Sequence, residues 1–566
     1  MIDKKIKQLR NKFNRFNIDG YIIPKNDEFF SEYSAINRLK IISNFDGTAG
    51  LAIVLRKKNY LFVDGRYTIQ AQQQSGKEFK IIEIHKFRPY KIIKNLTLGF
   101  DPDLFTTKQL KVYFGNSLML KQINKNLIDE IYKEKAPKIK TFFSLNNKVA
   151  GKTFKSKINK IRNIIKSNKA DYLFVSAPEN VAWVLNIRGS DNPNSPIPNC
   201  RLIIGKEKEL FLITQKKKAL KIIKEKKISK KKIINSEKFE DLIKKLKGSK
   251  FIIDPLSCSV INENVIKSKF QIINMNDPCY KLKSIKNSSE IKHMINAHIE
   301  DGVALTKFIY WIKNINKKKI TEINSQEKLE KFRKLNKNYL SPSFDTIAAT
   351  GPNAALPHYI ATKKSNKIIK KSDIFLCDSG GQYKFGTTDV TRTICFSKQK
   401  NSIKDIFTKV LKGHIAVATT NLKKFNTGKK VDARARYFLK KDGFDYAHGT
   451  GHGVGFFSNV HEGPQSITKI NTVKLEKGMI VSNEPGYYKK GHYGIRIENL
   501  LYIKKINNKL HFENLTLAPI DKDLINFKLL NNKEKKYFNE YHMKVYMTLN
   551  PYLNKTEKTW LKSFTS

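Results

Sequence analysis

Five acidic or imidazole side chains stand in apolar, glycine-rich settings in the last third of the chain. They are Asp378, Asp389, His452, Glu484 and Glu498. A carboxylate at the end of a buried strand is costly unless a cation compensates its charge. Together these side chains could supply the ligands for two divalent ions that share bridging carboxylates. Such an oxygen-rich ligand set suits Mn²⁺ best, with Zn²⁺ or Co²⁺ as alternatives.

The elements that must position these residues can be predicted from the surrounding pattern. An apolar run from Ile374 to Cys377 predicts a strand ending on Asp378, and alternation from Asp389 to Phe396 predicts a second strand. If the two strands pair as a hairpin, both aspartates can reach the same side. Either aspartate alone would more simply be a turn cap or a solvent-facing acid. Three later clusters make a shared site the better interpretation: HGTGHGVG at 448–455, MIVSNEPGYY at 479–488 and GIRIENLLYI at 494–503.

The sequences of these motifs resemble those of a known family. The ordered ligands, with HGTGHG and EPGYY around them, are similar to those of the pita-bread metallopeptidases. Within that superfamily the chain most resembles aminopeptidase P, the Xaa-Pro aminopeptidases, in their long three-domain form. The resemblance rests on the phrases DSGGQYKFGTTDVTRT, HGTGHGVGFFSNVHEGPQ and NEPGYYKKGHYGIRIEN, and upstream on SFDTIAATGPNAALPHY, WVLNIRGSDNP and NFDGTAGLAIV. It therefore spans nearly the whole chain.

The resemblance implies a role for each ligand. Asp378 would bind one metal through both carboxylate oxygens, Asp389 and Glu498 would bridge the two metals, and His452 and Glu484 would complete the other site. A hydroxide held between the metals would attack the carbonyl of the first peptide bond. Glu484 would also act as general base.

Other side chains of the site are implied in the same way. His358, His448 and His461 match family positions that line the substrate cleft and act on the scissile carbonyl or in proton transfer. A lone histidine in such a loop would more often be structural, but three in register with the metal set favour catalysis. Arg496 would orient the acidic cluster from behind the ligands. Phe385 stands where relatives carry an acidic residue; because it lies in a turn, we expect no effect on the chemistry.

The family removes an N-terminal residue that precedes proline. An X-Pro bond has no amide N–H, so peptidases that read this group handle it poorly. Two alternatives stay open. The chain could be a prolidase-type X-Pro dipeptidase, or a non-catalytic binding protein on the pita-bread fold. The five retained ligands argue against the second alternative, and two leading α/β domains with a C-terminal tail argue against the first.

The chain of 566 residues is long enough for several domains. A helix followed by DGYIIP is echoed by a helix followed by ADYLFVS, which suggests two related creatinase-like α/β domains, at 1–150 and 151–286. Asn287 to Glu290 reads as a capping box that opens the pita-bread catalytic domain, 287–515. An aromatic, lysine-rich helical extension, 516–566, completes this α/β (α+β) architecture. In the family this extension is associated with dimerisation, so we expect a homodimer.

Composition sets further expectations. The formal charge is +58, but the lysines are spread along the chain, which favours a solvated surface over a specific nucleic-acid partner. Five cysteines with no close spacing predict reduced, buried thiols. The N-terminus lacks the apolar segment of a signal peptide, and no window approaches a membrane span. We therefore expect a cytoplasmic enzyme that acts on peptides with penultimate proline and has no membrane partner.

Overall fold

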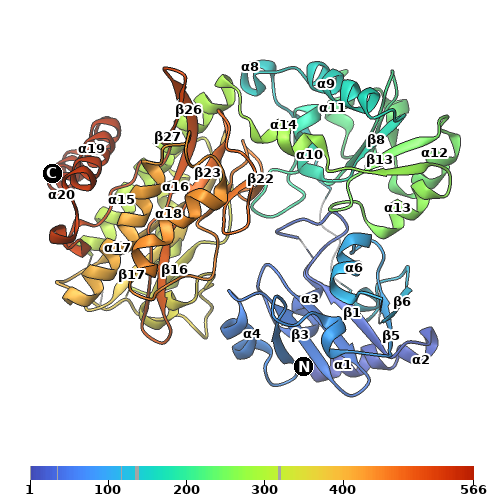
Figure 1. Ribbon diagram of the computed structural model, residues 1–566, viewed down its shortest axis with the longest axis horizontal. Coiled ribbons are helices and arrows are strands. Elements are labelled where there is room, and N and C mark those ends of the chain that lie inside the picture. Colours follow the sequence, from blue (N-terminus) through green and yellow to red (C-terminus); the bar gives the residue numbers. More distant parts are fainter. Residues whose placement is uncertain (1, 35, 117, 134–138, 316–319) are drawn as a thin grey trace. The chain divides into compact units, whose positions relative to one another are not determined.

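The computed structural model describes residues 2–34, 36–116, 118–133, 139–315 and 320–566 (Figure 1). The chain divides into two compact units. The first comprises residues 1–147 and 152–279, and the second comprises residues 148–151 and 280–566. All residues predicted to form the metal site belong to the second unit.

The first unit contains two six-stranded sheets with the same topology. The first sheet has the order β4-β3-β2-β1-β5-β6, and the second has the order β12-β11-β10-β8-β13-β14. The strands of the first are β1 (Gly20–Pro24), β2 (Leu51–Leu55), β3 (Asn59–Val63), β4 (Lys80–Glu83), β5 (Thr97–Phe100) and β6 (Met119–Gln122). Those of the second are β8 (Tyr172–Val175), β10 (Arg201–Gly205), β11 (Leu210–Ile213), β12 (Ile233–Ile234), β13 (Lys250–Ile253) and β14 (Gln271–Asn274).

Strand directions repeat as well as strand order. In each sheet the central strand pairs antiparallel with the second strand and parallel with the fifth, as β1 does with β2 and β5 and as β8 does with β10 and β13. A helix precedes each central strand: α1 (Ile2–Arg10) in the first half and α9 (Phe154–Ser167) in the second. The expected pair of related α/β domains is confirmed.

Strand β3 of the first sheet ends in a tight turn. The run from Tyr60 to Tyr67 is a strand only as far as Val63. Asp64 then folds back, and its carboxylate accepts a hydrogen bond from the Arg66 backbone N–H at 3.0 Å. Aspartate followed by glycine favours such a turn over a continued strand.

The longest helix of the second unit that the structure describes is the 27-residue α15 (Ser288–Asn314), and its predicted capping box is confirmed. The Asn287 side chain accepts from the backbone of residues 289 and 290, and Glu290 accepts from the Asn287 backbone. Three further helices of this unit, before the C-terminal extension, are α16 (Glu322–Lys334), α17 (Asn401–Ala418) and α18 (Gly428–Lys440).

Two small sheets carry the predicted aspartates. β17 (Ile374–Ser379) pairs antiparallel with β20 (Val390–Cys395) and with β16 (Ile347–Thr350). The connection between β17 and β20 is more than a turn. It holds a second hairpin of β18 (Gly381–Tyr383) and β19 (Gly386–Thr387), with β15 (Tyr339–Pro342) at its side. The predicted pairing of the two strands, β17 and β20, is therefore confirmed. The segment that connects them is a second hairpin, not a short turn.

A five-stranded sheet and a hairpin carry the remaining ligands. The sheet has the order β22-β21-β23-β26-β27, and the hairpin consists of β24 (Gly486–Lys489) and β25 (Tyr493–Arg496). The sheet strands are β21 (Gly451–Gly453), β22 (Glu462–Ile467), β23 (Ile480–Asn483), β26 (Asn499–Ile506) and β27 (Lys509–Asn514). Each predicted ligand on these elements lies in a strand or directly beside one.

The C-terminal extension forms α19 (Asn532–Leu549) and α20 (Lys555–Thr565), which lie side by side and pack on α15 of their own unit (Figure 1). Several of its aromatic residues face inward. Phe538 and Tyr541 are buried in a core shared with β20 and α17, and Trp560 packs against Tyr310 of α15. These aromatic side chains attach the extension to its own unit, while Tyr552 stays exposed, and the homodimer stays a prediction.

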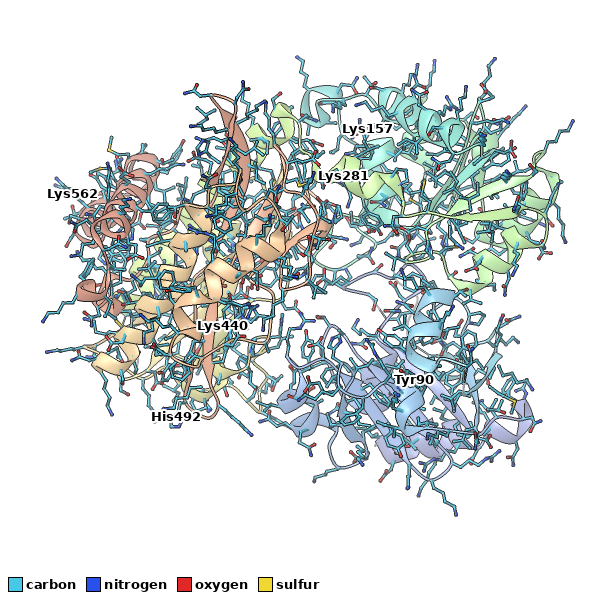
Figure 2. The ribbon with its side chains drawn as sticks, viewed as in Figure 1. Tyr90, Lys157, Lys281, Lys440, His492 and Lys562 are labelled. Atoms are coloured by element: carbon cyan, nitrogen blue, oxygen red, sulfur yellow. The ribbon has the colours of Figure 1, made fainter. Side chains whose placement is uncertain are left out.

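The surface and the cysteines agree with the composition. Lysines such as Lys440 and Lys562 extend outward from the second unit (Figure 2). All five cysteines are buried and free of disulfides. Among the helices that the structure describes, none is both long enough and apolar enough to cross a bilayer.

Candidate active site

The structure brings the five predicted ligands into one cluster. Asp378 lies near the end of β17, Asp389 directly precedes β20, and His452 is the middle residue of β21. Glu484 follows β23, and Glu498 lies between β25 and β26. Strand ends from three sheets therefore meet at one place, although the residues span more than one hundred positions of sequence.

The tightest group is Asp389, His452 and Glu498, which offer one ligand atom each within 4.8 Å of one another. Nε2 of His452 lies 3.4 Å from Oδ2 of Asp389 and 3.6 Å from Oε1 of Glu484. The other ring nitrogen, Nδ1, lies 2.9 Å from the carbonyl oxygen of Gly453. A hydrogen bond from Nδ1–H to that carbonyl leaves Nε2 as the free lone pair, which is the tautomer that a metal ligand requires.

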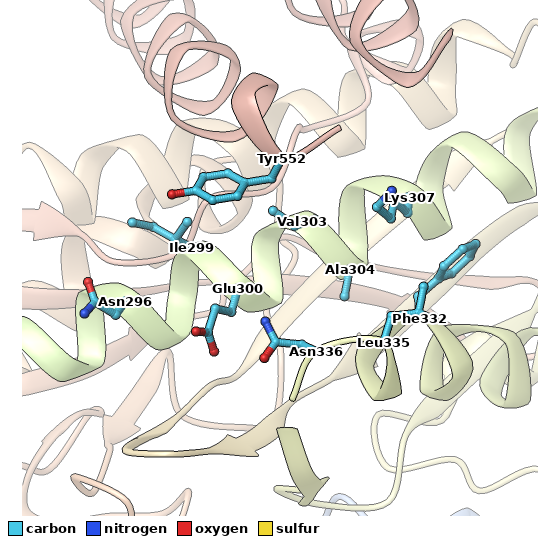
Figure 3. Close-up of a pocket in the computed structure, with 10 residues that line it drawn as sticks. All are labelled: Asn296, Ile299, Glu300, Val303, Ala304, Lys307, Phe332, Leu335, Asn336 and Tyr552. Carbon is cyan, nitrogen blue, oxygen red and sulfur yellow. The ribbon is translucent and has the colours of Figure 1, made fainter. Parts of the chain in front are cut away.

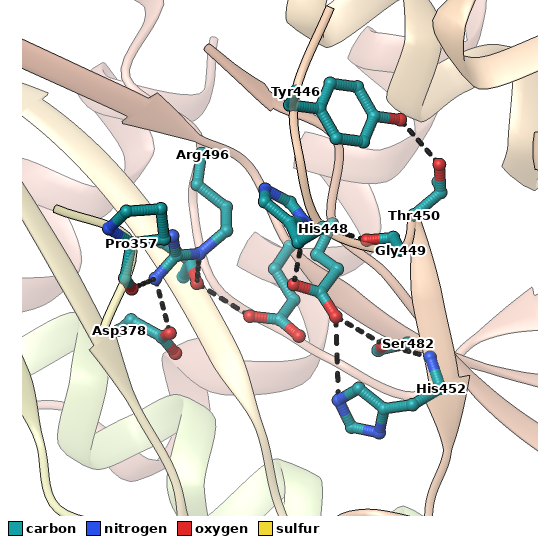
Figure 4. Close-up of polar contacts among 12 residues, drawn as sticks. Pro357, Asp378, Tyr446, His448, Gly449, Thr450, His452, Ser482 and Arg496 are labelled. Atoms are coloured by element: carbon teal, nitrogen blue, oxygen red, sulfur yellow. Dashed lines mark hydrogen bonds and ion pairs between the residues drawn. The ribbon is translucent and has the colours of Figure 1, made fainter. Parts of the chain in front are cut away.

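Arg496 lies against the cluster and contacts it directly (Figure 4). Its Nη2 donates to Oδ2 of Asp378 at 2.6 Å and to the carbonyl of Pro357 at 3.3 Å. Its Nε donates to the hydroxyl of Thr391 at 3.1 Å, and this hydroxyl donates to Oε2 of Glu498 at 2.6 Å. One buried guanidinium thus orients two of the predicted ligands, Asp378 directly and Glu498 through Thr391.

Tyr488 and Ser482 were missed by the sequence reasoning. The Tyr488 hydroxyl accepts from Nη1 of Arg496 at 2.6 Å and lies 2.9 Å from Nε2 of His448. The Ser482 hydroxyl donates to Oε1 of Glu484 at 3.1 Å and accepts from the His452 backbone at 2.9 Å. The EPGYY and VSNEPG phrases contain both residues, but only the folded hairpin shows which side chain reaches the cluster.

The three predicted catalytic histidines surround the cluster to different degrees. Nδ1 of His448 lies 3.9 Å from Oε2 of Glu484 (Figure 4). The ring of His461 lies 4.2 Å, centroid to centroid, from that of His452, and His461 is exposed. His358 directly follows Pro357, the residue whose carbonyl is held by Arg496. The structure therefore places His448 and His461 against the ligands and ties the loop of His358 to Arg496.

Burial and mutual repulsion shift the protonation of the cluster. Burial, with the charges of Asp378 and Glu484, raises the pKa of Asp389 to about 6. Burial, with the charges of its three carboxylate neighbours, raises the pKa of Glu498 well above its ordinary value. Burial alone would lower the pKa of His452, but its hydrogen bond to Asp389 and the nearby carboxylates raise it to about 9. The cluster therefore needs added positive charge, from protons or from a cation.

The residues also fit a metal by their donor chemistry. Oδ1 of Asp378 is buried and has no hydrogen-bond partner among the described residues. Carboxylate oxygens and one imidazole nitrogen converge there, and these donors suit Mn²⁺, Zn²⁺ or Co²⁺. An orphaned buried oxygen beside a crowded acidic group is explained by a bound cation.

A separate cavity of about 660 Å³ lies elsewhere in the second unit, between α15, α16 and the C-terminal extension (Figure 3). Its lining residues are Asn296, Ile299, Glu300, Val303, Ala304, Lys307, Phe332, Leu335, Asn336 and Tyr552. The predicted site residues are not among them, so this cavity is distinct from the acidic cluster.

Comparison with known proteins agrees with this geometry. A model of metallopeptidase family M24 matches residues 292–505, and a model of the C-terminal region of peptidase M24 matches residues 508–566. Two models of the creatinase/prolidase N-terminal domain match residues 5–118 and 133–290. The fold and site thus define a metallopeptidase of family M24 that carries two creatinase-type N-terminal domains.

Full-length relatives narrow this class. A probable Xaa-Pro aminopeptidase P from Laccaria bicolor is 35% identical over 99% of this chain and 92% of its own length. The chain belongs to the Xaa-Pro aminopeptidase P family. The crystal structure of X-prolyl aminopeptidase from Caenorhabditis elegans, described as a cytosolic enzyme with a di-nuclear active site, superposes with a TM-score of 0.91 at 29% identity and covers 100% of both chains. The prolidase from Pyrococcus horikoshii is 26% identical, has a TM-score of 0.53, and covers 65% of this chain and 99% of its own.

Proposed function

We propose that this chain is a metal-dependent aminopeptidase that removes the N-terminal residue from peptides with proline in the second position. The observation that carries the proposal is that Asp378, Asp389, His452, Glu484 and Glu498 converge on one cluster, with Asp378, Asp389 and Glu498 buried and the other two partly exposed. The full-length likeness to Xaa-Pro aminopeptidases supports the substrate class.

The same cluster supports a dinuclear centre. Asp389 and Glu498 would bridge two ions, Asp378 would hold one of them, and His452 and Glu484 would hold the other. Bound there, two divalent ions would lower the pKa of a water molecule and stabilise negative charge on the carbonyl oxygen of the substrate. We propose Mn²⁺ as the native ion, because carboxylate ligands outnumber the single imidazole.

The chain's own groups would move the proton and hold the substrate. Glu484 would accept the proton of the attacking water, while its Oε1 is kept in place by the Ser482 hydroxyl. Nε2 of His448 lies 2.9 Å from the Tyr488 hydroxyl, which would hold this ring in place at the edge of the cluster. His461 and His358 would face the substrate from the loops on either side. These roles require a neutral His448 and an ionised Glu484 at working pH.

The two alternatives are less well supported. A prolidase-type dipeptidase resembles only 65% of this chain, whereas the aminopeptidase structure covers all of it. A binding protein without catalytic activity would not need to retain five converging ligands that are oriented by an arginine and a threonine.

The test compares three synthetic peptides after complete chelation and readdition of Mn²⁺. Ala-Pro-Ala should release free alanine, Ala-Ala-Ala should be cleaved far more slowly, and the dipeptide Ala-Pro should be a poor substrate. Mass spectrometry identifies the products. Faster cleavage of Ala-Pro than of Ala-Pro-Ala would favour the dipeptidase, and no cleavage of any peptide would favour a binding protein.

We also propose the four-part division at 1–150, 151–286, 287–515 and 516–566. It is supported by the two repeated sheets and by the capping box at Asn287. A cytoplasmic location is supported by the five buried free thiols and by the cytosolic structural relative.

A homodimer remains a further proposal. Its support is the large apolar residues left exposed on the extension, Met543 (60% exposed), Met547 (62%) and Tyr552 (60%). Light scattering of the full chain should give a dimer, and the double variant Met543→Lys, Met547→Lys should give a monomer. A parent monomer would contradict the proposal, and a dimer unaffected by the double variant would place the interface elsewhere.

A further inference from the structure

The hairpin between the two predicted aspartate ligands does more than connect them. In this hairpin Gln382 of β18 and Thr387 of β19 are direct cross-strand partners. Directly opposed residues of an antiparallel pair project to the same face. Both side chains are fully buried, with 1% and 0% exposure, so their polar atoms must find partners inside the protein.

Those partners are the two backbone groups of one residue, Ser458. The Ser458 N–H donates to Oγ1 of Thr387 at 3.2 Å, and the Thr387 hydroxyl donates to Oε1 of Gln382 at 2.9 Å. Nε2 of Gln382 then donates to the Ser458 carbonyl at 2.9 Å. The three residues form a closed ring of hydrogen bonds, and the Thr387 hydroxyl also lies 3.3 Å from the Ser458 carbonyl oxygen. A fully satisfied buried ring of this kind holds its backbone segment in a single position.

The segment held by this ring is a strained turn. The Gly455 N–H donates to the Asn459 carbonyl at 3.1 Å and closes the turn. At its centre Phe457 has φ +44°, in the left-handed region that bulky side chains rarely adopt. Such a conformation persists only where its surroundings fix it. The Phe385 ring at the tip of the same hairpin adds to the constraint, because it packs edge-on against Phe457 at 5.9 Å.

This turn leads directly to His461. His452 and His461 lie on the two sides of the turn, and their ring centroids are 4.2 Å apart. His461 is exposed on its outer side, so its own burial does not fix its ring. We propose that Gln382 and Thr387 are positioning residues for His461, because they clamp Ser458 and so fix the turn that sets this ring beside His452. The inference rests on the proposed function, since it takes His461 as a catalytic group.

The experiment compares single and double variants of the full chain with bound Mn²⁺. Thr387→Val keeps the shape of the side chain but leaves the Ser458 N–H without its acceptor. Its matched control is Thr408→Val in α17, where a fully buried threonine hydroxyl likewise accepts a backbone N–H, that of Asn526, at 2.9 Å. Gln382→Glu is the second test variant, because it replaces the Nε2 donor by an oxygen of equal size.

Misplacing a catalytic group by about 1 Å can cost roughly 100-fold in rate, so we expect Thr387→Val and Gln382→Glu to lower kcat by about 10- to 100-fold. KM and the calorimetric affinity for Mn²⁺ should stay within about threefold, since substrate and metal contacts are unchanged. Thr408→Val should match the parent in all three quantities. In a His461→Ala background, Thr387→Val should cause no further loss, because the residue that it positions is gone.

The outcomes separate this inference from the function on which it rests. A parent that binds no Mn²⁺ and cleaves no peptide would refute the proposed function itself. With an active parent, three results would overturn the proposal that Gln382 and Thr387 position His461. They are full activity of His461→Ala, full activity of Thr387→Val, or a loss of kcat from Thr387→Val that is equally large with and without His461. A loss of Mn²⁺ affinity as large as the loss of kcat would also overturn the proposal, since Gln382 and Thr387 would then act through the metal ligands.

Discussion

Nη2 of Arg496 lies 2.6 Å from Oδ2 of Asp378, and the arginine side chain is only 3% exposed. Burial alone would lower the pKa of this guanidinium, but Tyr488 and the carboxylates of Asp378, Glu484 and Glu498 raise it well above its ordinary value. The positive charge of this guanidinium thus partly balances the negative charge of the acidic cluster. Oδ1 of Asp378, which has no hydrogen-bond partner among the described residues, is left available to a metal.

Replacing Arg496 should therefore damage both stability and metal binding. Arg496→Met removes one partner of a buried charge pair, and such a loss costs roughly 3–5 kcal/mol. Calorimetry should show weaker Mn²⁺ binding together with a lower unfolding temperature. Arg496→Lys keeps the charge but not the fork that reaches Asp378, Thr391 and Tyr488, so it should recover only part of the affinity. Full Mn²⁺ affinity in the Arg496→Met variant would show that the arginine does not orient the ligands.

Glu484→Gln should nearly abolish turnover while leaving the fold intact. The change removes a ligand charge and the proposed base together, without changing the size of the side chain. We expect kcat to fall by at least about 1,000-fold, in the range found when a general base is lost together with other stabilisation. Steady-state kinetics on Ala-Pro-Ala measures it, with circular dichroism to verify folding. Glu476→Gln, at the partly exposed ion pair with Lys281, is the control and should match the parent. Activity of Glu484→Gln within a few-fold of the parent would mean that the base is misassigned.

Acid should loosen the C-terminal extension. Burial, with the charges of Arg392 and Lys522, lowers the pKa of His542 from 6.5 to about 3, and its Nε2 must stay unprotonated to accept the Ile520 N–H at 3.0 Å. The folded pKa is below the unfolded one, so this contribution to stability is complete above pH 6.5 and is lost as the pH falls toward 3. The loss is roughly 2 kcal/mol by pH 5.

Hydrogen exchange of the α19 amides at pH 7.5 and pH 5 measures this effect. After correction for intrinsic exchange, α19 should open more readily at the lower pH. His542→Gln retains an acceptor that does not titrate, so the pH dependence should be much smaller in this variant. His511→Gln changes an exposed histidine and should behave as the parent does. An α19 equally protected at both pH values would contradict the assigned protonation state.

Local patterns predicted much of the fold. The alternation from Asp389 to Phe396 is the strand β20, and the capping box at Asn287 starts α15. The weak echo between two helix-strand segments proved to be a full repeat of strand order and direction. These features depend on neighbouring residues, which is why the sequence shows them. Which aromatics of the extension are covered depends instead on distant elements: Phe538 and Tyr541 are buried, whereas Tyr552 is exposed.

The candidate site likewise has features that local sequence patterns predict and features that depend on distant residues. The candidate ligands could be picked out because each lies in or beside a strand within a motif that resembles a family. The supporting contacts could not, because they join distant positions. Thr391 meets Glu498 across 107 residues, and Gln382 meets Ser458 across 76. No local pattern marks such a pair, since each partner alone looks like an ordinary buried polar residue.

The most direct test of the central claim is a Mn²⁺ titration of the chelated full chain, with binding followed by calorimetry and turnover of Ala-Pro-Ala followed in the same samples. If the chain is a dinuclear hydrolase, two ions should bind per chain and activity should appear as the two sites fill. Glu498→Gln, which lacks the charge of a bridging ligand, should lose both Mn²⁺ binding and turnover. Full activity after exhaustive chelation, or unchanged binding and turnover in Glu498→Gln, would contradict the account.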